Sequence, residues 1–117
     1  MVKYKESVIY KICCRNVEIK SQYIGSTTNF NRRKSAHKER CNNESSDKYH
    51  LNVYQFIRNN GGWTNFCMIE VEKCNKADKH ELHKRERYYI ETLNSELNVY
   101  IPTQTQKEYK QRPKRWH

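Results

Sequence analysis

The chain has 117 residues, enough for one domain with a single modest core. Its formal net charge is +10, an excess that favours binding to a polyanion such as nucleic acid. No long apolar run and no basic amphipathic helix supports a membrane surface as the alternative partner. Residues 1–6 lack the apolar core of a signal peptide, so we expect an intracellular protein, in the cytoplasm or the nucleus.

The five cysteines are expected to be reduced thiols. Their number is odd, none of them forms a CxxC pair, and no export signal accompanies them. Adjacent Cys13 and Cys14 would point to opposite faces of a strand. We interpret the set as small buried apolar residues rather than as a zinc site.

Two strands are predicted near the N-terminus. Residues 7–14 are rich in β-branched and aromatic types, which suits a strand. Residues 19–25 form a second extended run, which we expect to end at Gly25.

The link between these strands decides how two tyrosines meet. A two-residue turn, or a four-residue loop over 15–18, would place Tyr10 directly opposite Tyr23 on one face of the hairpin. A three-residue loop would put the two tyrosines on different faces. Val17 disfavours a positive φ, so we favour the four-residue loop. Two adjacent phenols can also be a simple packing pair.

A first helix is predicted from Thr28 or Asn29, either of which can cap it, to about Cys41. One stripe of this helix mixes side chains in a way that is unusual for packing alone: Phe30, Arg33 or Lys34, His37 and Cys41. Between residues 32 and 40, five side chains are basic and only Glu39 is acidic. Such a run is usually a solvated face, but beside the tyrosine strands it favours phosphate contacts by Arg32, Lys34, Lys38 and Arg40.

A polar linker over 41–46 precedes a second helix, which Ser46 or Asp47 can cap. Four residues are predicted to form its buried side: Leu51, Val53, Tyr54 and Ile57. The helix should end at residues 59–62, where glycine is available for a left-handed cap. A third strand follows over 63–71, with three buried residues: Phe66, Ile69 and Val71.

A third helix is predicted from Asp78, which opens an Asp version of the capping box. Its apolar stripe is Leu82, Tyr89, Ile90 and Leu93, and Glu86 lies within that stripe. A carboxylate among buried positions needs a cation, because burying an unpaired charge costs at least several kcal/mol. An ion pair with Arg33 or another arginine would satisfy it, and so would a divalent metal ion. His80 and His83 have HxxH spacing, which is weak evidence for a metal site.

The composition changes at residue 102, so we predict a folded domain over 1–101 and a basic tail over 102–117. The tail contains one acid, Glu108, and five bases: Lys107, Lys110, Arg112, Lys114 and Arg115. As a disordered segment or as a short helix near 107–111, it can bind phosphates.

Five motifs in order resemble the GIY-YIG family of nucleases. They are VIY at 8–10, YIG followed by Ser-Thr at 23–27, R-x-x-x-H at 33–37, GGW-x-x-F at 61–66 and E-x-x-Y-I at 86–90. The similarity covers roughly residues 7–100. Val8 replaces the family's usual glycine, a change in backbone packing that leaves Tyr10 in place. The sequence looks most like the small stand-alone members found in large DNA viruses and phages.

The resemblance implies an α+β fold, with a small three-stranded antiparallel sheet flanked by helices. It implies metal-dependent hydrolysis of a DNA phosphodiester, with Tyr23 as general base assisted by Tyr10 and His37. Arg33 would hold the phosphate, and Glu86 would bind one Mg²⁺ or Mn²⁺. A tyrosine with a pKa of about 10 is a poor base at neutral pH, so nearby cations would have to stabilise the phenolate. The implied catalytic residues are Tyr10, Tyr23, Arg33, His37, Glu86 and, with a weaker match, Asn98.

DNA is therefore the expected partner, with branched and nicked forms among the candidate substrates. Two alternatives remain open. One is a catalytically silent nucleic-acid-binding module, against which the intact motif residues speak. The other is an enzyme or scaffold that works only with a protein partner.

Overall fold

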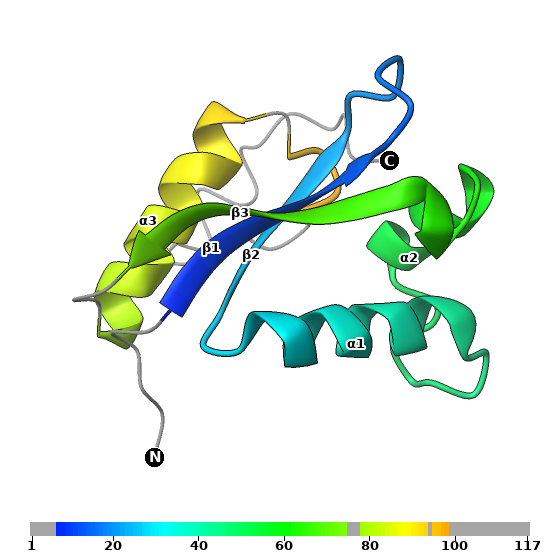
Figure 1. The fold of residues 1–117 in the computed structure, drawn as a ribbon, viewed down its shortest axis with the longest axis horizontal. Helices are drawn as coiled ribbons and strands as arrows, with labels where there is room; N and C mark the ends of the chain where they lie inside the picture. The colour runs from blue at the N-terminus through cyan, green and yellow to red at the C-terminus, as the bar shows by residue number, and fades with distance from the viewer. Residues whose placement is uncertain (1–6, 75–77, 94, 99–117) are drawn as a thin grey trace, which may run out of the picture.

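The computed structural model describes residues 7–74, 78–93 and 95–98. Three strands form one antiparallel sheet in the order β2-β1-β3: β1 (Ser7–Cys14), β2 (Gln22–Thr27) and β3 (Phe66–Cys74). α1 (Phe30–Asn42) and α2 (Asn52–Asn59) cover one side of this sheet, and α3 (Lys79–Thr92) covers the other (Figure 1). The predicted α+β fold with a three-stranded antiparallel sheet is confirmed.

Each side of the sheet has its own core. On the α1–α2 side, the buried residues include Tyr10, Ile12, Tyr54 and Phe66. On the α3 side they are Ile9, Ile24, Cys74, Leu82 and Ile90. Across the described ranges, every helix is too short or too polar to span a bilayer.

The link between β1 and β2 is longer than predicted. Residues 15–21 join the strands, and a turn closes where the Ile19 N–H donates to the Asn16 carbonyl at 3.0 Å. The predicted four-residue loop is therefore wrong. So is the expected end of the strand at Gly25, since β2 continues to Thr27.

The longer link shifts the register of the hairpin. Tyr10 pairs with Gly25, and Tyr23 pairs with Ile12, so the predicted direct pairing of Tyr10 with Tyr23 is wrong. Because the register differs by two residues, side-chain alternation still leaves both tyrosines on the same face.

Gly25 lies directly beneath the ring of Tyr10. A Cβ at position 25 would stand 2.4 Å from Tyr10 Oη and 2.5 Å from Cζ, which is far inside van der Waals contact. The absence of a side chain at Gly25 is thus what lets the phenol of Tyr10 cross the neighbouring strand.

The caps of α1 and α3 form as predicted. The Asn29 side chain accepts from the Arg32 N–H at 3.1 Å, and the Asp78 side chain accepts from the Glu81 N–H at 2.8 Å. Each cap therefore fixes the residue at which its helix begins.

The start of α2 was predicted too early. The Ser46 hydroxyl accepts from the Lys48 N–H in a local turn, and the helix begins only after Leu51, which makes no side-chain cap. Leu51 is 40% exposed rather than buried, whereas Val53, Tyr54 and Ile57 are buried as predicted. The glycine cap is confirmed: Gly61 has φ 104°, and the Gly62 N–H donates to the Ile57 carbonyl at 2.9 Å.

The third strand is displaced toward the C-terminus relative to the prediction. Trp63–Asn65 forms a 3₁₀ turn (η2), and β3 itself begins at Phe66 and ends at Cys74 rather than at residue 71. Alternation places Phe66 and Met68 on the α1–α2 side, so Ile69 points the other way and is 44% exposed instead of buried.

Side-chain hydrogen bonds tie α3 to β3. The Arg85 guanidinium donates to both carboxylate oxygens of Glu72, and the Tyr89 hydroxyl donates to Oε1 of the same residue at 2.6 Å. This cluster joins α3 to β3 at Arg85, the residue before Glu86.

Candidate active site

A buried histidine links two phenols on the α1–α2 side of the sheet. His37 Nε2 lies 2.7 Å from Tyr10 Oη, and its Nδ1 lies 2.7 Å from Tyr54 Oη. All three residues are at most 2% exposed. Burial, together with the charges of Arg33 and Arg40, lowers the pKa of His37 to about 3. The imidazole is therefore neutral near pH 7, with one nitrogen as donor and the other as acceptor.

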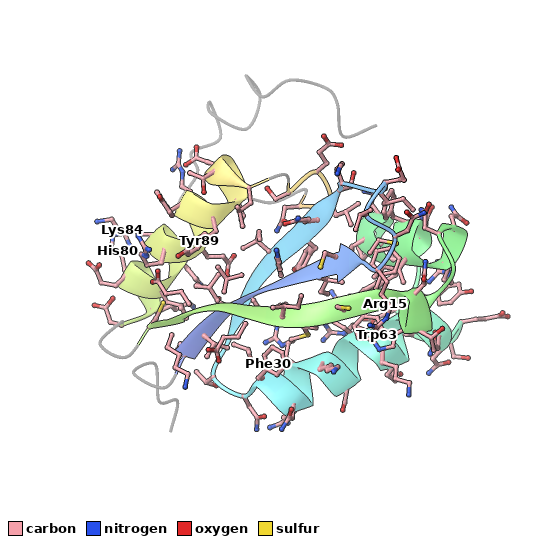
Figure 2. All side chains as sticks on the ribbon, turned by 45° about the horizontal axis from the view of Figure 1, so that its top comes forward. Arg15, Phe30, Trp63, His80, Lys84 and Tyr89 are labelled. Atoms are coloured by element: carbon pink, nitrogen blue, oxygen red, sulfur yellow. The ribbon has the colours of Figure 1, made fainter. Side chains whose placement is uncertain are left out.

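Aromatic side chains enclose this histidine. Tyr23 meets the His37 ring edge-on at 5.8 Å between centroids, and Trp63 stacks on it at 6.4 Å. Phe30 packs edge-on against Tyr10 at 6.4 Å. Figure 2 shows Phe30 and Trp63 beside α1, on the side of the sheet away from α3. The histidine is thus held by ring contacts as well as by hydrogen bonds.

Both tyrosines are protonated near pH 7. Burial raises the pKa of Tyr10 well above its usual value, with a further increase from Tyr23. Burial and the negative charge of Glu86 raise the pKa of Tyr23 to about 12. The positive charge of Arg33 acts in the opposite direction on both phenols. Tyr23 is partly exposed, whereas Tyr10 is fully buried.

Glu86 approaches from α3 at the edge strand β2. The Ser26 hydroxyl donates to Glu86 Oε1 at 2.5 Å. Burial raises the pKa of Glu86, while this hydrogen bond and the charge of Arg33 lower it. In the part of the chain that the structure describes, Glu86 and Arg33 form no ion pair, so the structure does not show the ion-pair alternative.

Asn98 acts on the outer edge of β2. Its side chain, 3% exposed, accepts from the Ile24 N–H and donates to the Ile24 carbonyl, both at 2.7 Å. The Leu97 N–H donates to the Gln22 carbonyl at 3.2 Å. The amide of Asn98 therefore replaces a missing neighbouring strand at the residue between Tyr23 and Gly25.

The motifs that the sequence shares with nucleases thus come together around β1 and β2. The family model for the GIY-YIG catalytic domain matches residues 6–100 of the chain. This protein belongs to the GIY-YIG family. Its domain is accordingly of the nuclease type, in a family of phosphodiester hydrolases. Comparison with curated proteins gave no match, and comparison with solved structures gave none either.

GIY-YIG nucleases generally use divalent metal ions, and Glu86 is the side chain here that fits one. Its carboxylate is partly buried, and the Ser26 contact is its one hydrogen bond among the described residues. No group of three His, Cys, Asp or Glu side chains within those residues could hold a metal. A single carboxylate suits Mg²⁺, which keeps most of its water ligands. His80 and His83 lie on α3 without a third ligand from the described residues.

Basic side chains of this GIY-YIG domain lie along α1. Arg32, Lys34 and Lys38 are exposed, and Arg33 and Arg40 are partly buried beside the aromatic cluster. The five predicted tail residues, Lys107, Lys110, Arg112, Lys114 and Arg115, lie outside the described residues, as does the predicted boundary at residue 101.

Three neighbours of the site were not singled out for a functional role by the sequence. Tyr54 was expected only in the core, and the roles of Ser26 and Trp63 were not anticipated. One signal was available for Tyr54, because a tyrosine at a buried helical position needs a partner for its hydroxyl. No local spacing indicates that this partner is His37.

Proposed function

We propose that this protein is a metal-dependent DNA endonuclease that hydrolyses a phosphodiester bond by attack of water. One arrangement supports this above all. Tyr10 hydrogen-bonds to His37 at 2.7 Å, and Tyr23 contacts the same ring, while Arg33 and Glu86 influence both phenols electrostatically. Phenols, a guanidinium and a carboxylate together provide a base, a phosphate ligand and a cation ligand.

Tyr23 is the general base in this proposal. Tyr23 is more accessible than Tyr10. After burial, the negative charge of Glu86 is the largest cause of the raised pKa of Tyr23. Neutralisation of Glu86 by a cation would remove that effect and lower the pKa of Tyr23 toward its usual value. A phosphate held by Arg33 then places the attacked phosphorus near the phenol.

His37 assists by hydrogen bonding rather than by taking a proton. Its pKa is about 3, whereas that of Tyr10 lies well above 10. Transfer of the Tyr10 proton to His37 is therefore unfavourable, because burial opposes both the phenolate and the imidazolium that it would create. His37 therefore orients Tyr10 and stabilises its oxygen.

When bound, Mg²⁺ or Mn²⁺ supplies positive charge that stabilises the departing oxygen, and Glu86 is its protein ligand. Arg33 contributes charge stabilisation from the protein itself. Asn98 supports the segment of β2 that carries Tyr23 and so acts on its position rather than on the substrate.

DNA binding is assigned to the basic residues that surround these groups. Arg32, Lys34, Lys38 and Arg40 would contact phosphates beside the cleavage site, and the basic tail would add further phosphate contacts. Branched and nicked DNA are among the candidate substrates. A protein partner could select between these forms.

The test is plasmid nicking with Mg²⁺, with Mn²⁺ and with a chelator. Glu86→Gln should reduce nicking at least a hundredfold while leaving gel-shift affinity for DNA within about twofold, because affinity comes mainly from basic residues. Glu91→Gln is the matched control, since Glu91 lies on the same helix and pairs with Arg87 at the surface. It should nick normally.

Two results would contradict the proposal. Undiminished nicking by Glu86→Gln would show that the cation is held elsewhere. DNA binding by the wild-type protein without nicking in either metal would favour the silent binding module.

A further inference from the structure

Two of the five cysteines lie opposite each other on neighbouring strands. In the register of β1 with β3, Cys13 pairs directly with Cys67. All five cysteines lie within the described residues, and all are free thiols. Cys14 points to the other face of β1, because side chains alternate along a strand. Cys41 lies on α1, and Cys74 is at the far end of β3. Cys13 and Cys67 are therefore the one pair of cysteines that the sheet places opposite each other.

Backbone hydrogen bonds define the geometry of this pair. Two residues farther along the same register, the Arg15 N–H donates to the Asn65 carbonyl at 2.8 Å. Hydrogen-bonded and non-hydrogen-bonded pairs alternate along an antiparallel ladder, so Cys13 and Cys67 also form a hydrogen-bonded pair. The Cα atoms of such a pair are roughly 5.5 Å apart, within the range of about 4.4–6.8 Å that a disulfide spans. The two backbones are therefore close enough for the sulfurs to bond.

A small reagent can reach both thiols. α3 packs on the end of the sheet that contains Ile9, through Leu82 (Figure 1). Cys13 and Cys67 lie farther along the same face, and each is partly exposed. Ile69, the next residue of β3 on this face, is 44% exposed. Among the described residues, no helix buries this part of the sheet.

We propose that Cys13 and Cys67 are a reversible oxidation site, at which hydrogen peroxide forms a disulfide between β1 and β3. One thiolate attacks a peroxide oxygen and the O–O bond breaks, which leaves a sulfenic acid and a hydroxide that takes up the thiol proton. The other thiol attacks the sulfenic sulfur, so that the S–S bond forms, the S–O bond breaks and a second water leaves. Each sulfur loses one electron, and the peroxide accepts both. This site does not depend on the proposed function.

The same geometry predicts that the bond is easily reduced. Side chains of a hydrogen-bonded pair stand farther apart than those of a non-hydrogen-bonded pair, so a disulfide must draw them together. A strained or exposed disulfide has a higher reduction potential than a relaxed, buried one, and thiols reduce it more readily. Cys13 and Cys67 would therefore switch between the two states rather than form a permanent crosslink.

The test treats the full folded chain with one equivalent of hydrogen peroxide. It is run at about pH 8.5, because burial raises the pKa of Cys13 and oxidation needs thiolate. The remaining thiols are then blocked, and the chain is digested with trypsin without reduction. The free thiols should fall from five to three, and peptide 12–15 should be linked to peptide 59–73. Excess glutathione should restore all five thiols.

Substitutions identify the linked residues, because peptide 12–15 contains both Cys13 and Cys14. Cys13→Ser and Cys67→Ser should each abolish the link. Cys14→Ala is the matched control: it removes the adjacent thiol on the opposite face and should leave the link and its reduction unchanged. Should Cys14→Ala fail to fold, Cys13→Ser decides alone, since it retains Cys14. Oxidation of the wild-type chain in denaturant should give mixed links, because the fold no longer sets the pairing.

A folded wild-type chain that keeps five free thiols under peroxide would overturn the proposal. A link that persists in Cys13→Ser would also overturn it, and so would a disulfide of Cys14 with Cys13 or with Cys41. A link that resists glutathione would contradict a reversible site. Nicking is not the readout in any of these experiments, so the proposed function can fail or hold independently.

Discussion

The two faces of the sheet use the same three strands for different purposes. On the α3 side, the interior is mainly apolar, with Ile9, Ile24, Leu82 and Ile90 in contact. On the α1–α2 side, the interior contains neutral His37, which is hydrogen-bonded to two phenols. Apolar packing requires only shape and volume, whereas buried polar groups also require matched donors and acceptors.

This difference predicts different responses to mutation. Changes on the α3 side should mainly alter the free energy of unfolding, because no reacting group is lost with the packing. Changes on the α1–α2 side should alter chemistry even where stability changes little. Glu86 is the exception on α3, since it reaches the edge of β2 through Ser26.

Leu82→Ala should have the largest effect on stability. Leu82 is 4% exposed in the apolar core, so its truncation should reduce the free energy of unfolding by about 2–5 kcal/mol. Denaturant unfolding measures this loss. Below the unfolding transition, kcat for nicking should stay within about threefold of wild type. A small loss of stability with a large loss of kcat would contradict the separation of the two faces.

Gly25→Ala should affect both properties. The new methyl group would overlap the phenol of Tyr10, so the free energy of unfolding should fall by about 1–3 kcal/mol. Displacement of Tyr10 should also disrupt its hydrogen bond to His37 and reduce nicking at least a hundredfold. In a Tyr10→Ala background the same substitution should cost little further stability. Equal costs in both backgrounds, measured by denaturant unfolding, would show that Tyr10 is not the residue displaced.

His37 should make stability depend on pH. In the folded protein its pKa is about 3, against an ordinary value of 6.5, so below pH 6.5 the unfolded chain binds a proton that the folded protein does not. Stability present above pH 6.5 is therefore lost as the pH falls, by up to about 1.4 kcal/mol per pH unit. Comparing the slopes of wild type and His37→Asn between pH 6.5 and 5 isolates this contribution. Equal slopes would indicate that His37 takes up a proton equally in the folded and the unfolded protein, and would contradict a lowered pKa.

The smallest expected effect distinguishes the exposed surface of α1 from that of α3 by the salt dependence of DNA binding. Lys34→Gln on α1 should reduce the log–log salt slope of DNA binding by about 0.9, the value of one phosphate contact. Lys84→Gln on α3, where Figure 2 shows the side chain pointing away from the sheet, should leave the slope unchanged. The reverse result would place the DNA on the α3 side.

Local rules predicted the parts of this fold that depend on neighbouring residues. The caps of α1 and α3 follow from Asn29 and Asp78, because each side chain bonds to a backbone N–H three residues away. The shared face of Tyr10 and Tyr23 survived an incorrect loop, since a shift of two residues preserves side-chain alternation. The predicted start of α2 was wrong because the Ser46 hydroxyl accepts a hydrogen bond within a turn. The local sequence pattern does not distinguish such a turn from a helix cap.

The sequence by itself therefore determined the element types, the common face of the tyrosines and the family to which the motifs point. Only the tertiary structure decided the register that sets Tyr10 over Gly25, the choice of Tyr54 as second partner of His37, and the use of Asn98 to complete the edge of β2. Caps and alternation act over a few residues along the chain. The other contacts join residues 15 to 74 positions apart, and they exist only once the helices have packed on the sheet.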